Sequence, residues 1–263
     1  MTIIPLTPLD LTIASGLIGL LVLLSWRMRL GLIRQLIIAA LRTTVQLLLI
    51  GMVLKVLFAS VHLGLMAAMA MVMLFAAGWQ VLRSQKRRFA GWWGMGLGSL
   101  SMFISSFTIT LFALNVIIAV KPWYTPQYAI PLLGMLLGNT MNGVALGLDR
   151  LTVTAWDQRS VIEGRLMLGQ TRGQAIAQIC RESIRGGLIP IINSMTVAGL
   201  VSLPGMMTGQ ILGGNPPLEA VKYQILIMFL IAGGTGLGTM GAVWLGSRRL
   251  FDARHRLRLD HLR

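Results

Sequence analysis

The chain has 263 residues, of which 55% are hydrophobic and 12% charged, and its formal net charge is +15. A soluble domain of this length does not need so much apolar side chain, so the composition excludes one and predicts a membrane protein. The basic excess does not indicate nucleic-acid binding, because it is divided among short segments without interleaved aromatic residues. Membrane topology and anionic lipid headgroups account for it.

Seven apolar windows are long enough to cross a hydrocarbon core of about 30 Å. They cover residues 9–26, 36–56, 61–82, 92–120, 127–148, 186–203 and 218–246. We therefore expect an all-α, multi-pass protein of about seven transmembrane helices, folded as one transmembrane domain over residues 1–263. In the first window the arginines follow the apolar run, which favours a retained helix over a signal peptide.

Basic residues predict the orientation of these spans. With the N-terminus outside, 19 of the 23 Lys and Arg fall in the segments that alternation places inside, namely 27–35, 83–91, 149–185 and 247–263. Positively charged loops stay in the cytoplasm. The N-terminus is therefore expected outside and the C-terminus in the cytoplasm.

Arg42 and Gln46 are polar residues one helical turn apart in the second window. A charge inside a membrane span needs a polar partner or a water-filled cavity, which favours a residue of the transport pathway or of an interface. Arg42 is also within two turns of the predicted cytoplasmic end, so a side chain that reaches the membrane surface explains it equally well.

Pairs of glycines four residues apart occur in the fifth and seventh windows. They are Gly134 with Gly138, Gly143 with Gly147, and Gly234 with Gly238. This spacing allows two helix backbones to approach closely. It predicts tight helix contacts, either within one protomer or between two.

Residues 149–185 form the one sizeable polar segment, and a pair of helices is expected within it at about 157–185. Ser160 with Glu163 and Thr171 with Gln174 have the spacing of capping boxes, and Gly169 lies between the two pairs. Glycine tolerates the left-handed conformation that often ends a helix. The segment is therefore predicted to form two short helices joined by a turn at Gly169.

The segment Leu203-Pro-Gly-Met-Met-Thr-Gly-Gln-Ile-Leu-Gly-Gly-Asn-Pro-Pro connects the last two windows. It is apolar, but its glycines and prolines are unfavourable in a straight helix, so broken or re-entrant backbone is expected. Thioether and amide groups suit a transition metal that is held briefly. A metal pathway is predicted from Met206, Met207, Asn139, Asn142 and Met135; the alternative is that the methionines fill gaps in the packing.

The chain lacks a loop that would hold ATP. A phosphate-binding Walker loop ends in Gly-Lys followed by Ser or Thr, and none of the four lysines stands in that context. If transport is driven by ATP, ATP and magnesium must bind to a separate subunit. A secondary transporter is the other class considered, but it normally needs a carboxylate inside a span, and the eight acids lie outside the spans or at a span end.

The polar segment resembles the cytoplasmic coupling loop of ATP-binding-cassette (ABC) permeases. That pattern is Glu-Ala-Ala, three residues, Gly, nine residues, Ile, one residue and Leu-Pro. Glu163, Gly169 and Ile179 match it. Gly164-Arg165 replaces the two alanines, and Arg181-Glu182 replaces Leu-Pro. The resemblance implies that these residues contact an ATPase.

Three further stretches resemble the bacterial iron-export ABC permease family and similar plant permeases tied to aluminium tolerance. They are Leu41-Arg42-Thr-Thr-Val-Gln46-Leu, Pro131-Leu-Leu-Gly134-Met-Leu-Leu-Gly138-Asn139, and Gly199-Leu-Val-Ser-Leu-Pro204-Gly-Met-Met-Thr-Gly209 with Lys222-Tyr-Gln224. The resemblance implies a multi-pass permease of the bacterial inner (plasma) membrane that exports iron or a related metal. It also implies a homodimer that pairs with an ATP-binding subunit and has neither enzymatic activity nor a cofactor of its own. An ABC permease for another substrate, such as a nucleotide sugar or another small solute, is the alternative.

Overall fold

The structure is a computed structural model that describes residues 7–59, 62–252 and 254–262. The chain forms two compact units. One runs to His62 and includes Leu212–Gly214, and the other consists of Leu63–Ile211 and Asn215–Arg263. The prediction of a single transmembrane domain therefore stays a prediction.

Two long helices make up most of the first unit, α1 (Pro8–Arg27) and α2 (Ile33–Ala59). α1 starts at a capping box in which the backbone N–H of Thr7 donates to the Asp10 carboxylate at 2.8 Å. Both helices are apolar around most of their circumference and bury almost no side chain inside this unit. Helices that are hydrophobic all round are expected in lipid.

The rest of the chain supplies the other elements. In chain order these are α3 (Leu63–Ser84), α4 (Trp92–Met102), η1 (Phe103–Phe107), α5 (Thr108–Phe112), η2 (Ala113–Ile117), α6 (Pro126–Asp157), α7 (Arg159–Met167), α8 (Arg172–Val197), α9 (Gly205–Leu212), α10 (Pro217–Arg249) and η3 (Leu259–His261). The elements from α4 to η2 form one apolar segment, in which η1 and η2 are π-helical.

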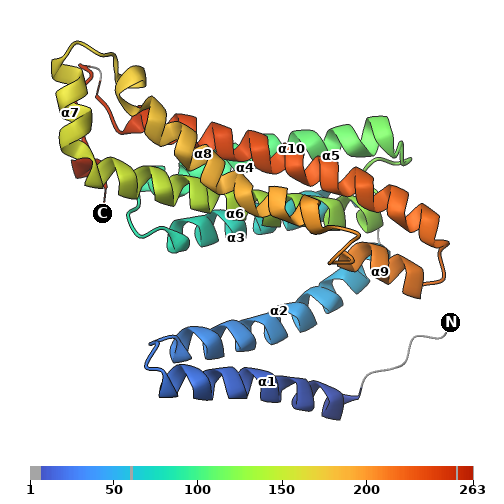
Figure 1. Ribbon diagram of the computed structural model, residues 1–263. Helices are drawn as coiled ribbons and strands as arrows, with labels where there is room; N and C mark the ends of the chain where they lie inside the picture. Colours follow the sequence, from blue (N-terminus) through green and yellow to red (C-terminus); the bar gives the residue numbers. More distant parts are fainter. Residues whose placement is uncertain (1–6, 60–61, 253, 263) are drawn as a thin grey trace. The chain divides into compact units, whose positions relative to one another are not determined.

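α6, α8 and α10 pack side by side as the centre of the second unit (Figure 1). Their close approach depends on glycines. A Cβ atom on Gly143 of α6 would lie 3.1 Å from the carbonyl oxygen of Gly187 on α8 and 2.6 Å from the Thr239 hydroxyl on α10. Gly147 of α6 faces Thr239 and Val243 in the same way. The predicted tight helix contacts are confirmed within one protomer for Gly143 with Gly147 and for Gly234 with Gly238, but not for Gly138, which has no neighbouring atom within 4 Å.

These contacts also give the relative directions of the three helices. Gly143 and then Gly147 meet Thr239 and then Val243, so α6 and α10 are parallel. Gly143 faces Gly187, whereas Gly147 faces Ser183, so α8 is antiparallel to α6. The end of α6, the start of α8 and the end of α10 therefore lie together, and α7 lies at the same end (Figure 1).

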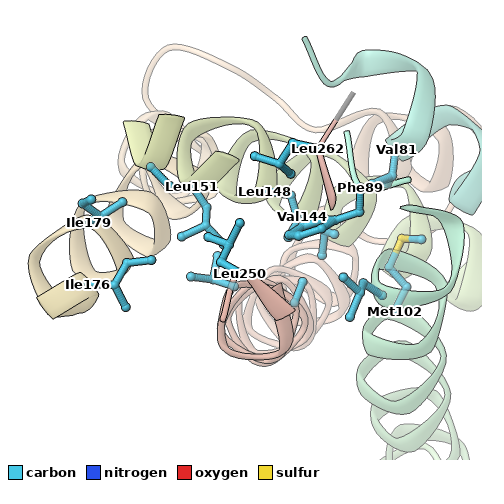
Figure 2. Close-up of a cluster of buried hydrophobic side chains, with 14 of the residues drawn as sticks. Val81, Phe89, Met102, Val144, Leu148, Leu151, Ile176, Ile179, Leu250 and Leu262 are labelled. Carbon is cyan, nitrogen blue, oxygen red and sulfur yellow. The ribbon is translucent and has the colours of Figure 1, made fainter. Parts of the chain in front are cut away.

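A hydrophobic cluster fills the second unit at this end (Figure 2). It joins Val81 of α3 and Met102 of α4 to Leu148 of α6, Ile176 of α8 and Leu250 beyond α10. All five side chains are buried. Because five segments contribute to one close-packed core, this end of the bundle is rigid and supports the α7–α8 pair.

The predicted fold class is confirmed. In the described part of the chain there are no strands beyond isolated bridges, and six helical segments are long and apolar enough to cross a membrane. They are Pro8–Arg27, Ile33–Ala59, Leu63–Ser84, Trp92–Ile117, Pro126–Asp157 and Pro217–Arg249. The remaining window, 186–203, is not a separate helix. It is the apolar second half of the 26-residue α8 with the turn that follows, and the first half of α8 is polar.

Candidate functional site: a capped turn and two methionine-lined cavities

α7 and α8 form the predicted helix pair, joined by a turn over 168–171 that we call the coupling turn, after the role proposed for it below. Gly169 has a φ of +84° at its centre. The N–H of Gly169 donates to the carbonyl of Leu166 at 3.0 Å, and that of Gln170 donates to Arg165 at 3.1 Å. These bonds end α7 as a left-handed glycine does at many helix termini. The predicted role of Gly169 in the turn is confirmed.

α8 begins with the predicted capping box. The backbone N–H of Thr171 donates to the Gln174 side-chain oxygen at 2.9 Å, and the N–H of Gln174 donates to the Thr171 hydroxyl at 3.4 Å. Two N–H groups that would lack partners at a helix start are thus satisfied.

The second predicted capping box, between Ser160 and Glu163, is wrong. α7 already begins at Arg159, Gln158 is its N-cap, and no side chain caps it. α6 extends to Asp157, so one residue separates the two helices, and the N–H groups of Val161 and Ile162 bond to the Gln158 carbonyl instead. Ser160 is therefore inside the helix.

The three residues that match the coupling-loop pattern have different surroundings. Glu163 and Gly169 are exposed and line a groove beside the turn. Ile179 is buried, with 3% of its surface exposed, and packs in the hydrophobic cluster with Ile176 (Figure 2). Met167 and Leu168 form the tip of the pair and are 86% and 84% exposed.

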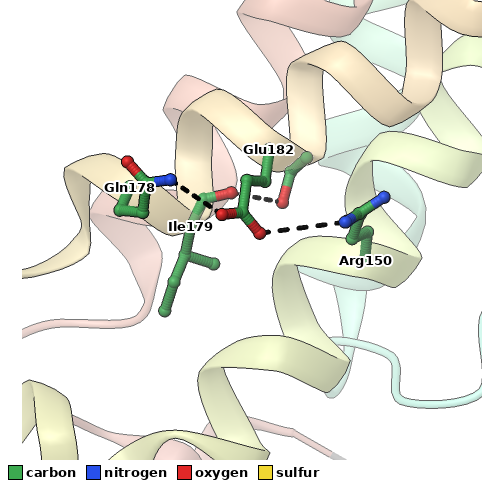
Figure 3. Close-up of polar contacts among 5 residues, drawn as sticks. Arg150, Gln178, Ile179 and Glu182 are labelled. Carbon is green, nitrogen blue, oxygen red and sulfur yellow. Dashed lines mark hydrogen bonds and ion pairs between the residues drawn. The ribbon is translucent and has the colours of Figure 1, made fainter.

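A polar contact joins α8 to α6 near the cluster (Figure 3). Glu182 of α8 accepts a hydrogen bond from the Gln178 amide at 2.7 Å and lies 3.8 Å from the Arg150 guanidinium on α6. Beside it, the buried Ser183 hydroxyl donates to the carbonyl of Ile179 at 2.7 Å. The ion pair is about half exposed and contributes little to stability, so the apolar packing holds the helices together.

The other wall of the groove is the C-terminal tail, residues 250–262. The tail folds back because the N–H of Arg258 donates to the carbonyl of Leu250 at 2.8 Å and because Leu262 pairs with Phe89. The groove has a volume of about 580 Å³ and includes the exposed Arg254 and Arg256. This part of the site was not predicted, since no local pattern in the tail sequence indicates it.

Asp252 forms the turn that presents those two arginines. Its carboxylate accepts the N–H of Arg256 and the N–H of Arg254, each at 2.8 Å. These hydrogen bonds, first the one from Arg256, hold the pKa of Asp252 below its usual range. The carboxylate is therefore ionised at neutral pH, and the turn loses this support only as the pH falls through that lowered pKa.

The predicted metal pathway is split between two cavities. Met206 and Met135 line one of about 410 Å³ between α6, α9 and α10, which we call the α6 cavity and which also includes Gln210 and Glu219. Met207 lines another of about 500 Å³ between α8, α9 and α10, the α8 cavity. Met206 and Met207 therefore do not share a site.

Neither predicted asparagine is among the residues that line these two cavities. Asn139 donates its side-chain N–H to the carbonyl of Met135 at 2.8 Å, one turn earlier in α6, and Asn142 is exposed. Among the described residues there is also no group of three or more His, Cys, Asp or Glu side chains placed to hold a metal.

Arg42 and Gln46 lie on α2 in the first unit, and both are exposed there. Their predicted role in a pathway or an interface stays a prediction, and so does the alternative that Arg42 reaches the membrane surface.

Comparison with known proteins supports the membrane assignment. The model of an uncharacterised protein family, UPF0014, matches residues 8–251. The UPF0014 membrane protein slr1647 of Synechocystis is 41% identical over 92% of this chain and 93% of its own. No solved structure matches the chain.

Two other relatives have more specific names. The probable iron export permease protein FetB of Escherichia coli is 32% identical over 97% of this chain and 96% of its own. Protein ALUMINUM SENSITIVE 3 of Arabidopsis thaliana is 33% identical over 86% of this chain and 81% of its own. Together with the six membrane-spanning segments, the match over residues 8–251 shows that this chain is a multi-pass membrane protein of the UPF0014 family.

Proposed function

We propose that this protein is the permease subunit of an ATP-driven ABC transporter that exports iron or a related metal across the bacterial inner membrane. The name of the E. coli relative supports the metal and the direction of transport. A second copy of the chain and an ATP-binding subunit complete the transporter, and ATP and magnesium bind to that subunit.

The observation that carries the proposal is the form of the α7–α8 pair. A capped, glycine-centred turn holds Met167 and Leu168 almost fully exposed, whereas Ile162 and Ala175 behind it are buried. A paired apolar tip on a rigid base is typical of a surface that binds another protein. In an ABC permease, that protein is the ATPase.

The surroundings of the tip indicate the charge of the partner surface. Arg254 and Arg256 of the tail and Arg172 at the start of α8 bring positive charge to the same end of the bundle. Charges at the rim of an interface guide the approach of an oppositely charged partner. We therefore expect the ATPase to present an apolar pocket for the tip with acidic residues around it.

The first prediction tests this interface. The double variant Met167→Glu and Leu168→Glu is expected to insert normally and to lose co-purification with the ATPase, because two charges would have to be buried in the pocket. The matched control exchanges the two residues, Met167→Leu with Leu168→Met, which keeps both volume and apolarity. The measurement is the amount of ATPase retained on the tagged permease. The candidate partner is a soluble protein with a Walker loop, whose gene we expect to lie next to that of the permease.

Full retention of the ATPase by the charged variant would refute the docking role of the tip. Loss of the ATPase in both variants would show instead that the tip is needed for the fold of the turn.

A further inference from the structure

The α8 cavity combines methionines with a buried oxygen that has no hydrogen-bond partner. The cavity has a volume of about 500 Å³, and its wall includes Met195 of α8, Met207 of α9, and Met228 and Gln224 of α10. The side-chain oxygen of Gln224 is buried and accepts no hydrogen bond from any described residue, and Gln224 as a whole is 8% exposed. A buried polar atom without a partner is unfavourable and needs an explanation.

The backbone around this cavity is built to leave it open. After α8, Gly199 adopts a φ of +84°, and its N–H donates to the Ser202 carbonyl at 2.9 Å in a tight turn. Pro204 then leads into the short α9, which brings Met207 opposite α10. A continuous helix over this segment would not bring Met195 and Met207 from two different helices to one wall.

The chemistry of the wall selects a class of ligand. Three thioethers and one amide oxygen are electron-pair donors without charge, and no described residue of the wall is ionisable. Thioether sulfur favours soft metal ions such as Cu(I), and hard ions prefer charged oxygen ligands. A hard trivalent ion would enter this wall without a single compensating charge.

We infer that the α8 cavity is a metal site for a soft or borderline cation of charge one or two, bound by Met195, Met207, Met228 and the Gln224 oxygen. The inference rests on the proposed function in its choice of a metal as the substrate. It moves the predicted site from Met206 and the asparagines to the other side of α9. A neutral set of ligands binds weakly enough to release the ion, as a transport pathway requires.

The experiment measures metal binding to the purified full-length permease in detergent, without the ATPase and with the change Cys180→Ser in every variant, because the free thiol would otherwise bind Ag⁺. Ag⁺ is the soft probe, Fe²⁺ the borderline one, and Al³⁺ the hard one. We expect saturable binding of Ag⁺, weaker binding of Fe²⁺ and none of Al³⁺. Changing Met195, Met207 and Met228 to leucine is expected to weaken Ag⁺ binding at least tenfold, and each single variant should show part of that loss.

The matched control is Met135→Leu with Met206→Leu, which removes the two methionines of the α6 cavity. We expect it to bind Ag⁺ as the unchanged protein does. Gln224→Glu is expected to strengthen Fe²⁺ binding, because it places a negative charge where the neutral oxygen lies. This gain cannot arise from a folding defect.

The inference is overturned if the triple variant keeps its Ag⁺ affinity, or if the α6 cavity variant loses it instead. Because no ATPase is present, a negative result would leave the coupling function untouched. Conversely, loss of ATPase docking in the tip variant says nothing against metal binding here.

Discussion

Gly187 shows how much a single residue contributes to this bundle. Its added Cβ would lie 2.5 Å from the carbonyl oxygen of Gly143 and 2.7 Å from the Thr239 methyl group. A carbonyl of a neighbouring helix cannot rotate away, so a methyl group here forces α6 and α8 apart.

We therefore predict that Gly187→Ala lowers the stability of the permease by about 1–3 kcal/mol, the usual range for overpacking. The measurement is the midpoint of thermal unfolding in detergent. Gly186→Ala is the control, since its new methyl group would meet only the Arg150 side chain at 3.2 Å, and that side chain is about half exposed and able to move. Equal unfolding midpoints for the two variants would contradict this account of the contact.

The cap of α8 could be predicted from the sequence because its chemistry is local. Thr171 and Gln174 exchange hydrogen bonds within one turn, so their spacing was sufficient to predict the cap. Ser160 and Glu163 have the same spacing, but the extension of α6 to Asp157 decides where α7 begins. Met206 and Met207 were predicted to share a site, yet consecutive side chains on a helix point about 100° apart.

At the scale of elements, the coupling turn depends on the left-handed conformation of Gly169. A β-branched residue at this φ of +84° costs roughly 1–3 kcal/mol of backbone strain. A Cβ atom added to Gly169 would have no other atom within 4 Å, so the effect comes from the backbone and not from a clash.

We predict that Gly169→Val leaves membrane insertion intact and separates ATP hydrolysis from transport, because the distorted turn no longer fits the ATPase. Gly173→Val is the matched control, as Gly173 is helical, exposed and equally free of neighbours. The measurements are transport and the ATPase activity that depends on it, in reconstituted vesicles. If the Gly169→Val variant still couples ATP hydrolysis to transport, the turn does not have the proposed coupling role.

Other elements could not be predicted from the sequence because their positions depend on residues far away along the chain. The tail is held by Leu262 against Phe89, more than 170 residues earlier, and by Leu250, which is fully buried. The apolar window at 186–203 predicted a separate span. Hydropathy measures only how apolar the residues are, so it could not indicate that the polar residues before the window belong to the same helix. The glycine pairs predicted close packing but not which helices meet.

At the scale of the whole molecule, the helix directions agree with the orientation that the basic residues predict. The ends of α6 and α10 and the start of α8 meet at one end, as they must if α8 crosses the membrane between α6 and α10 in addition to the six segments given above. Arginines at this end lie over tryptophans, with Arg87 3.9 Å from the ring centre of Trp156 and Arg248 3.8 Å from that of Trp244. Trp and Arg side chains together are typical of a cytoplasmic membrane boundary.

We therefore predict that the C-terminus is cytoplasmic. A green fluorescent protein fused after residue 263 should fluoresce, and an alkaline phosphatase at the same position should be inactive. Fusions after Lys121, in a loop that the same map puts outside, should show the reverse behaviour. Active phosphatase at the C-terminus would show that the predicted orientation is reversed. The coupling turn would then lie outside the cell, where a cytoplasmic ATPase cannot reach it.

α8 connects the coupling turn to the wall of the α8 cavity. It is one unbroken helix whose 26 residues span about 39 Å, with the coupling turn at one end and Met195 near the other. Between them, Gly187 is in close contact with Gly143 of α6. One turn further on, Pro190 removes a backbone hydrogen bond and allows the helix to bend. If an ATPase docks at the turn, as we propose, a movement of the turn reaches the wall of the α8 cavity along one continuous helix, and Pro190 is the point at which that helix can bend.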